Sequence, residues 1–300
     1  MPELPEVEVA ARSLSHWARG RRVRAVSVTD KRTLDGGKPA ALAVLVGTRL
    51  AGVERIGKNL LLTFRAGTAA KQPVGVWSHL GMTGKWLCRT PDDPAPRFAR
   101  LRLDFVGGPT LYFADLRLFG FFRLVPKADF TALPILAALG PDPLRTGIDT
   151  ARLAERLGRS RLPIKVSIMD QALIPGVGNI QASEGLNRAG IDPRRPARSL
   201  TAPEIARLAR GLLASFHHTL RSFEAAGALP PEITTVARPT GAKRAEKRTS
   251  DVTYVEEPGT HNPFRVYERA GARCPRCRKG TIERIVQAGR STYFCPACQH

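Results

Sequence analysis

The beginning of the chain places a potential nucleophile beside an acid. Pro2 and Glu3 follow Met1, and removal of the initiator methionine, usual before a small second residue, would make Pro2 the terminus. A terminal proline is a secondary amine, and its condensation with a sugar aldehyde gives an iminium ion that acts as an electron sink. The α-amino group has a reference pKa of roughly 7.7–8.0, against roughly 10.4 for lysine, so more of it is free base near neutral pH. These residues indicate a covalent catalyst or, alternatively, a helix that simply begins with prolines.

Four cysteines near the other end of the chain have the spacing of a metal site. The pairs Cys274/Cys277 and Cys295/Cys298 are separated by 17 residues, which is typical of a tetrahedral four-cysteine zinc site. Four protein sulfurs leave no open coordination position, so we expect one structural Zn²⁺. Redox-active cysteine pairs are the weaker alternative, because two matched pairs are present. The fifth cysteine, Cys88, is expected to be a thiol in the core.

The charge of the chain points to a polyanionic partner. The 47 lysines and arginines exceed the 26 acidic residues and give a net charge of +21. Such a surplus favours nucleic acid first and an anionic membrane second, although part of it can be solvated surface. The sequence contains no run of 18 apolar residues, so it predicts no membrane-spanning helix. The N-terminus lacks the pattern of a signal peptide. We therefore expect no membrane association.

The first half of the chain is expected to form a helix followed by a β-domain. Residues 5–20 have helical spacing of apolar side chains, and Gly20 follows as a possible C-cap. From about residue 22 to 125 the pattern becomes that of strands, with a hairpin over 100–113. We predict an N-terminal domain over residues 1–130, built as a β-sandwich or a barrel, which carries the terminal Pro2. A proline- and glycine-containing linker over residues 131–150 follows.

The second half is expected to be helical. Asp149 can cap a helix that ends near Leu157, residues 168–174 have a short helical pattern, and residues 179–188 form a further helix. Thr201-Ala202-Pro203-Glu204 is a capping box before a long amphipathic helix. We predict a helical DNA-binding domain over residues 151–262. It includes a basic loop over residues 230–262, because that stretch is rich in Pro, Gly, Thr and charge.

The last segment, residues 263–300, is predicted to be a zinc finger. The residues between the two cysteine pairs should form a hairpin that carries Arg284 and Arg290. A short zinc-bound ribbon with arginine is suited to contact a phosphate or a groove. The alternative for Arg290, considered alone, is a solvated position.

Together these segments resemble the formamidopyrimidine-DNA glycosylase family, which includes the endonuclease VIII-like enzymes. The resemblance covers nearly the whole chain. It depends on Pro2 to Glu8, Gly57 to Leu62, His79 to Gly84, Asp115 to Gly120, Pro175 to Ile180 and the four cysteines. The opening Glu-Leu-Pro-Glu-Val is more similar to the purine-lesion branch than to the endonuclease VIII branch. The resemblance implies an α+β fold: a β-sandwich domain, a helix-two-turn-helix domain and a four-cysteine zinc finger.

The resemblance also assigns catalytic roles. Pro2 would attack C1′ of the damaged nucleotide, and Glu3 would protonate or position the ring oxygen of the deoxyribose. Lys58 would contact phosphates and assist the reaction, and a solvated lysine is its alternative reading. Asn179 would hold a backbone phosphate together with the free N–H groups of the helix that it begins. Arg290 would bind the phosphates beside the lesion.

Three further residues would fill the gap left by the extruded nucleotide. By resemblance these are Met82, Arg117 and Phe119, with Phe119 as an aromatic wedge and Arg117 as the donor to the unpaired base. Ordinary packing for Met82 and Phe119, and a solvated charge for Arg117, are the alternatives. Leu118 departs from the family, where a second basic residue is usual. Because leucine cannot pair with a phosphate, a contact to the DNA backbone would be lost. Gln181 and Gly185 also depart from the expected tyrosine and serine-like residue.

The resulting expectation is a monomeric, bacterial, cytoplasmic and nucleoid-associated enzyme of base excision repair. It would be a bifunctional DNA glycosylase and AP lyase that acts on damaged double-stranded DNA. It would remove 8-oxoguanine and formamidopyrimidines through a Schiff base at Pro2 and β,δ-elimination. Three alternatives stay open: an endonuclease VIII-like glycosylase for oxidised pyrimidines, a catalytically inactive DNA-binding member, and an RNA-binding zinc-ribbon protein.

Overall fold

The computed structural model of the chain describes residues 2–67, 72–229 and 262–300. These residues divide into two compact units. The first contains Pro2, residues 6–137 and the segment from Arg221, and the second contains residues 3–5, 138–220 and the described residues from 262 to 300. The basic loop expected over 230–262 lies, except for its last residue, outside the described residues. The boundaries of the three predicted domains stay predictions.

The first unit begins with helix α1 (Leu4–Ala18). Its apolar side chains Leu4, Val7, Leu14 and Trp17 are buried, as the helical spacing predicts. The helix ends before Gly20, whose φ of +81° is the left-handed conformation that glycine adopts without strain. The expected helix over 5–20 is therefore present and begins one residue earlier.

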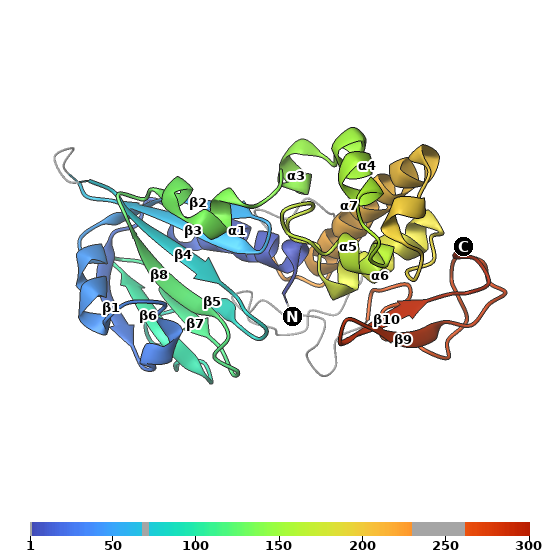
Figure 1. The fold of residues 1–300 in the computed structure, drawn as a ribbon. Coiled ribbons are helices and arrows are strands. Elements are labelled where there is room, and N and C mark those ends of the chain that lie inside the picture. Colours follow the sequence, from blue (N-terminus) through green and yellow to red (C-terminus); the bar gives the residue numbers. More distant parts are fainter. Residues whose placement is uncertain (1, 68–71, 230–261) are drawn as a thin grey trace. The chain divides into compact units, whose positions relative to one another are not determined.

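Two four-stranded antiparallel sheets form the rest of the first unit (Figure 1). The strand orders are β1-β6-β7-β5 and β2-β3-β4-β8. Trp86 of the first sheet packs edge-to-face on Phe113 at 5.4 Å between ring centroids and lies 6.1 Å from Phe122 of the second sheet. Aromatic side chains thus fill the layer between the sheets, which is the arrangement of a β-sandwich. The strands are β1 Val23–Val28, β2 Arg49–Ile56, β3 Asn59–Arg65, β4 Val74–His79, β5 Lys85–Arg89, β6 Ala99–Phe105, β7 Thr110–Ala114 and β8 Phe121–Pro126.

Short helical segments connect and complete this unit. The hairpin expected over 100–113 is formed by β6 and β7, with Leu103 opposite Leu111. Residues 130–146 contain brief helical turns and overlap the linker expected over residues 131–150. The short segments are η1 Lys31–Thr33, η2 Pro39–Leu45, η3 Phe130–Ala132, α2 Pro134–Ala137 and, in the second unit, α3 Pro143–Thr146.

The second unit is mainly helical. Its helices are α4 Thr150–Gly158, α5 Ile164–Ser167, α6 Asn179–Ala189, η4 Ala197–Ser199 and α7 Ala202–Ala225. The expected cap of α4 is present, because the Asp149 carboxylate accepts the N–H groups of Ala151 and Arg152. At the start of α7, the Glu204 carboxylate accepts the N–H of Thr201 at 2.8 Å, which is one half of the predicted capping box.

One expected helix is displaced. Residues 168–174 form turns, and the helical segment α5 lies before them at Ile164–Ser167. Pro163 is the N-cap residue of α5. The carboxylate of Asp170 then accepts the N–H of Ala172 at 2.9 Å. This local hydrogen bond stabilises a turn in competition with a helix.

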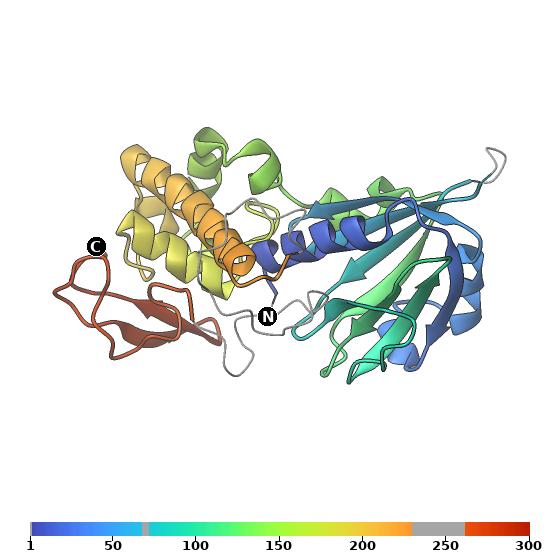
Figure 2. The ribbon, with the colours of Figure 1, turned by 180° about the vertical axis from the view of Figure 1, so that it is seen from behind.

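Helices α6 and α7 lie side by side, as both views show (Figures 1 and 2). A Cβ at Gly185 would overlap the side chain of Leu212, so glycine allows the close approach of the two helices. Gln181 is fully buried and accepts from Ser215 at 2.6 Å while it donates to Thr219 at 3.0 Å. These contacts explain the two residues that depart from the family pattern: both lie on the face of α6 that packs against α7.

The C-terminal segment is a two-stranded hairpin of β9 (Glu283–Gln287) and β10 (Arg290–Phe294). Ala288 and Gly289 both have positive φ in the two-residue turn, as a type I′ hairpin requires. The buried Glu184 of α6 accepts the N–H groups of Arg265, Val266 and Tyr267 at 2.8–3.1 Å. Helix α6 thereby anchors the chain that enters the zinc finger. Within the described residues, no helix is long and apolar enough to span a membrane.

Candidate active site and metal centre

The beginning of helix α6 holds Glu3. The Glu3 carboxylate is buried and accepts the N–H groups of Gly178, Ile180 and Gln181 at 3.0, 2.8 and 2.9 Å. These are N–H groups that a helix leaves unsatisfied at its N-terminus. Three donors on two oxygens fix the position of the carboxylate. Pro2, one residue earlier, is also buried.

This geometry corrects one expectation. The free N–H groups at the start of α6 were expected to bind a DNA phosphate. The structure shows three of them occupied by Glu3 instead. An intramolecular carboxylate satisfies the same positive helix end that would attract a phosphate.

Asn179 lies at the centre of a second group of contacts. Its side-chain oxygen accepts from the ammonium group of Lys165, and its amide donates to the carbonyl of Ser291 at 2.8 Å. Ser291 is next to Arg290, the exposed first residue of β10. The structure therefore brings Glu3, Asn179 and Arg290 together in the second unit.

Lys165 is a candidate site residue that the sequence did not indicate. Its side chain is 1% exposed, and burial, together with the charge of Arg290, lowers its pKa to about 8, while Glu3 raises it. A nearly buried lysine with a strongly lowered pKa is typical of a functional position. The sequence signal was a single charge between apolar residues in Pro163–Val166.

Lys58 belongs to the first unit, at the tip of a hairpin. Gly57 and Lys58 form the turn between β2 and β3, and Gly57 has a φ of +56°. The turn is held by Asn59, which accepts from the Trp77 indole at 2.9 Å and donates to the carbonyl of Ile56 at 3.1 Å. Lys58 is therefore half exposed and lies in a turn that these hydrogen bonds fix.

His79 lies near Lys58. Burial and the positive charge of Lys58 lower the pKa of His79 to about 4. The ring stacks on Phe121 with 5.6 Å between centroids, and its Nδ1 accepts the N–H of Gly81 at 3.0 Å. A neutral imidazole is therefore the form present near neutral pH, and it fixes the start of the loop that carries Met82.

Met82, Arg117 and Phe119 lie on two loops of the first unit. Residues 80–84 connect β4 to β5, and residues 115–120 connect β7 to β8. Phe119 is 55% exposed, and the guanidinium of Arg117 lies 5.0 Å from the centre of its ring. Leu116 is also 55% exposed. An apolar group this exposed on a rigid loop is typical of a binding surface, which argues against core packing for Phe119.

The four C-terminal cysteines converge on one point. All four sulfur atoms lie within 4.8 Å of one another, with 3.8 Å between Cys274 and Cys298 and 3.7 Å between Cys277 and Cys295. A tetrahedral Zn–S distance of about 2.3 Å places sulfur atoms about 3.8 Å apart. The cluster therefore fits one four-coordinate zinc ion and leaves no position for a substrate.

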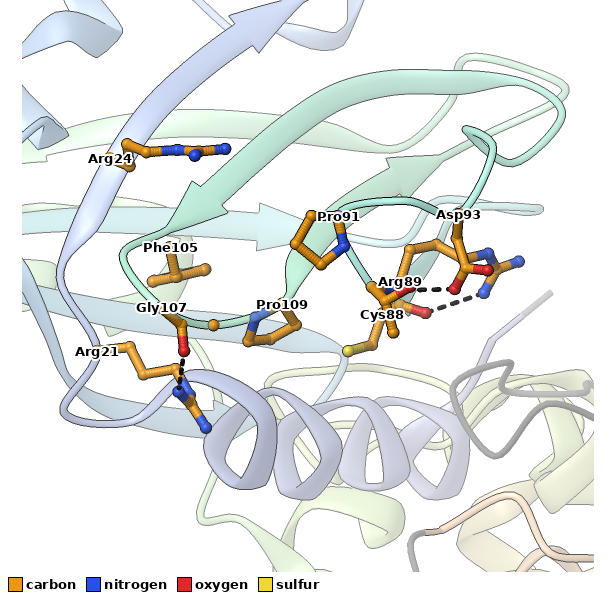
Figure 3. Close-up of a pocket in the computed structure, with 11 residues that line it drawn as sticks. Arg21, Arg24, Cys88, Arg89, Pro91, Asp93, Phe105, Gly107 and Pro109 are labelled. Atoms are coloured by element: carbon orange, nitrogen blue, oxygen red, sulfur yellow. Dashed lines mark hydrogen bonds between the residues drawn. The ribbon is translucent and has the colours of Figure 1, made fainter.

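A separate pocket of about 770 Å³ lies at the other end of strand β5 (Figure 3). None of the predicted site residues lines it. Half-buried Cys88 does line it, so this thiol is not a core residue as expected. In Figure 3 the guanidinium groups of Arg21, Arg24 and Arg89 do not converge on a common point. The pocket lacks the convergent polar groups of a binding site.

A β-sandwich, a helical unit and a four-cysteine finger in one chain define a class of DNA glycosylases. Three family models match the chain: Formamidopyrimidine-DNA glycosylase N-terminal domain over residues 1–122, Formamidopyrimidine-DNA glycosylase H2TH domain over 139–225, and Zinc finger found in FPG and IleRS over 271–300. The chain belongs to the formamidopyrimidine-DNA glycosylase family, whose members excise damaged bases and cleave abasic sites in base excision repair.

Similar proteins match over their full length. The formamidopyrimidine-DNA glycosylase of Chloroflexus aurantiacus is 38% identical over 303 residues, covering 100% of this chain and 98% of the relative. That of Thermus thermophilus is 36% identical with the same coverage. Among solved structures, a complex of the Lactococcus lactis enzyme with DNA containing an abasic site has a TM-score of 0.80 and 28% identity over 99% of both chains. The fold and class expected from the sequence are confirmed.

Proposed function

We propose that this enzyme removes oxidised purines, 8-oxoguanine and formamidopyrimidines, from duplex DNA. The observation that carries the proposal is the fixed Glu3 carboxylate one residue from Pro2. A solved complex of the Lactococcus lactis enzyme contains DNA with a formamidopyrimidine lesion, at 27% identity and a TM-score of 0.80. The opening sequence Glu-Leu-Pro-Glu-Val supports the same branch of the family.

The chemistry begins at the nitrogen of Pro2. This nitrogen forms a bond to C1′ as the glycosidic bond breaks, and the leaving base takes up a proton. Opening of the deoxyribose ring breaks the C1′–O4′ bond and gives the iminium ion, and O4′ takes up a proton. Glu3, which three N–H groups hold in place, would assist this step by protonating or positioning the ring oxygen. Loss of the C2′ proton then drives elimination of the 3′ phosphate, and a second elimination releases the 5′ phosphate and leaves a one-nucleotide gap.

The remaining residues bind the DNA. Lys165, Asn179 and Arg290 form a cluster in which two cations surround an amide, and this composition suits a phosphate beside the lesion. Lys58 would contact a phosphate from the first unit. Met82, Arg117 and Phe119 would enter the duplex and replace the extruded nucleotide, whose unstacking costs a few kcal/mol.

Two experiments test the proposal. Borohydride reduces an iminium to a stable amine, so the parent enzyme should form a covalent adduct with abasic DNA and a Pro2→Gly variant should not. If the parent enzyme formed no adduct, the catalytically inactive alternative would be favoured. Preferential binding to RNA over DNA in a competition assay would favour the RNA-binding zinc-ribbon alternative. Single-turnover excision from matched duplexes then ranks the lesions.

Oxidised pyrimidines are the second candidate substrate class. A solved complex of the Lactococcus lactis enzyme contains an oxidised pyrimidine in its DNA, at 28% identity and a TM-score of 0.80. The lesion panel should therefore include 5-hydroxy-pyrimidines beside 8-oxoguanine. Faster release of pyrimidines than of purines would overturn the purine assignment.

The proposed activity implies an oligomeric state and a cellular location. The enzyme would act as a monomer on damaged double-stranded DNA, in the bacterial cytoplasm and at the nucleoid. One DNA duplex per protein chain in analytical ultracentrifugation is the expected stoichiometry.

A further inference from the structure

The two loops that carry Met82, Arg117 and Phe119 touch through their backbones. Gly81 has a φ of +59°, and a Cβ there would overlap the backbone of Phe119 and Gly120. Only glycine fits this contact, for steric and conformational reasons together. The loop of residues 80–84 therefore lies directly against the loop of residues 115–120.

Asp115 connects the loops with its carboxylate. It is 1% exposed and accepts three donors: the hydroxyl of Thr83, the N–H of Arg117 at 3.1 Å and the N–H of Gly120 at 2.7 Å. The Thr83 oxygen also accepts the N–H of Arg117 at 3.1 Å. One buried carboxylate and one hydroxyl thus hold residues from both loops, and hydrogen bonds to a charged acceptor are the stronger kind.

Each of these hydrogen bonds to Asp115 comes from a residue that is, or directly follows, one of the three predicted DNA-contacting residues. Thr83 follows Met82, and the Arg117 N–H belongs to the predicted donor itself. Gly120 follows Phe119. Between Arg117 and Phe119, Leu118 has a φ of +57°, a left-handed conformation that costs energy for a residue with a side chain and persists only when its surroundings impose it.

We propose that Thr83 and Asp115 are positioning residues, which lock the two loops so that Met82, Arg117 and Phe119 enter the duplex as one rigid wedge. The inference rests on the proposed role of those three residues. A wedge that is ordered before binding avoids the entropy cost of ordering it during base extrusion. Without the lock, that cost is added to the unstacking of the target nucleotide.

The consequence is a selective defect. Extrusion is needed when the damaged base is paired in a duplex, whereas an abasic site in single-stranded DNA needs no wedge. Thr83→Val removes the hydroxyl at nearly constant volume. We expect it to slow single-turnover excision of 8-oxoguanine from duplex DNA about tenfold, the size of one buried hydrogen bond to a charged group. Cleavage of a single-stranded abasic site should change less than twofold.

Two control variants separate this role from a general loss of structure. Thr83→Ser keeps the hydroxyl and should retain duplex excision. Thr131→Val removes another hydroxyl that donates to an aspartate in the same unit, at 2.6 Å to Asp129, and should affect neither substrate. Equal losses on duplex and single-stranded substrates for Thr83→Val would overturn the proposal.

A double-mutant cycle separates the proposed role of Phe119 as a wedge from the proposed role of Thr83 in positioning it. If Phe119→Ala alone leaves duplex excision intact, the proposed wedge itself is wrong. If Phe119→Ala slows excision and Thr83→Val adds its full effect on top, Thr83 does not act through the wedge. The expected result is that Thr83→Val has little further effect in the Phe119→Ala background, because coupled residues are non-additive. Asp115→Asn should reproduce the selective defect, and thermal unfolding of each variant reports whether it folds.

Discussion

The carboxylate of Glu3 accepts the N–H of Ile180 at 2.8 Å, although the two residues are 177 positions apart. Helix α6 thus fixes a residue at the extreme N-terminus. The same helix begins with Asn179 and contains Glu184, which anchors the chain into the zinc finger. A single helix therefore positions the expected catalytic acid, a phosphate-binding amide and the entry to the metal centre.

The first prediction concerns the space at Gly178. A Cβ there would overlap the Glu3 carboxyl group, so Gly178→Ala should displace Glu3 and reduce the rate of borohydride trapping by about tenfold or more, by analogy with other small misplacements in active sites. Gly158→Ala is the matched control, because a Cβ at that position meets nothing within 4 Å. Unchanged trapping in Gly178→Ala would show that the position of Glu3 is not needed.

The second prediction concerns the charge of Lys165. Its pKa is lowered to about 8 by burial and by Arg290, so the ammonium group is present at pH 7 and is lost as the pH rises through about 8. Affinity for DNA with a stable abasic analogue should fall over this range in fluorescence anisotropy. Lys165→Met should bind more weakly at pH 7, lack this step and reduce the salt dependence by about one phosphate contact. A pH step of the same size in the variant would assign the titration to another group.

A third prediction follows from the ion pairs of Glu8. Its carboxylate accepts from Arg55 at 2.7 Å and Arg12 at 2.8 Å. Burial raises the pKa of Glu8, but the two arginines outweigh it and the pKa lies below 4.5. Glu8→Gln removes the carboxylate charge that faces the 3% exposed Arg55 and should lower the free energy of unfolding at pH 7 by about 1–3 kcal/mol.

The sign of the pH dependence for Glu8 follows from its lowered pKa. The stabilisation is present above the unfolded-state pKa and is lost as the pH falls through the folded-state value. The stabilities of parent and Glu8→Gln should therefore converge in acid when measured by urea unfolding. Asp35→Asn breaks a pair whose side chains are 43–46% exposed, and its effect should stay below about 0.5 kcal/mol. A constant difference between parent and Glu8→Gln from pH 7 to pH 3 would contradict the ion-pair explanation.

The fourth prediction concerns the metal. One zinc ion per chain should be found by elemental analysis, and Cys277→Ser should lose it. Because the hairpin of β9 and β10 is small, its fold depends on the metal, and removal by a chelator should abolish the contribution of Arg290 to DNA binding. Cys88→Ser should keep both the zinc and the affinity. Full affinity in zinc-free protein would show that the hairpin is stable without metal.

Much of the fold could be predicted because local signals were strong. Helix α1, the β6–β7 hairpin and the Asp149 cap all follow from residue type and period. The helix expected over residues 168–174 was wrong because Asp170 caps a turn, a choice that periodicity does not reveal. The zinc site followed from spacing alone.

The contacts within the site could not be predicted in the same way. That Glu3 occupies the N-terminus of α6 depends on the meeting of segments 175–178 positions apart. Lys165 was missed because nothing in an apolar run indicates that a lysine is held by a distant asparagine. The catalytic and DNA-contacting roles of the predicted residues stay predictions until the variants are measured.

The backbone contact at Gly81 also limits how this protein can evolve. Two segments about 30 positions apart share one interface, with no room for a side chain at Gly81 and a single carboxylate serving both. An insertion, or a bulky replacement, in either segment would have to be matched by a change in the other. Random mutagenesis with selection for repair should therefore recover substitutions in these segments as linked pairs, and glycine alone at position 81.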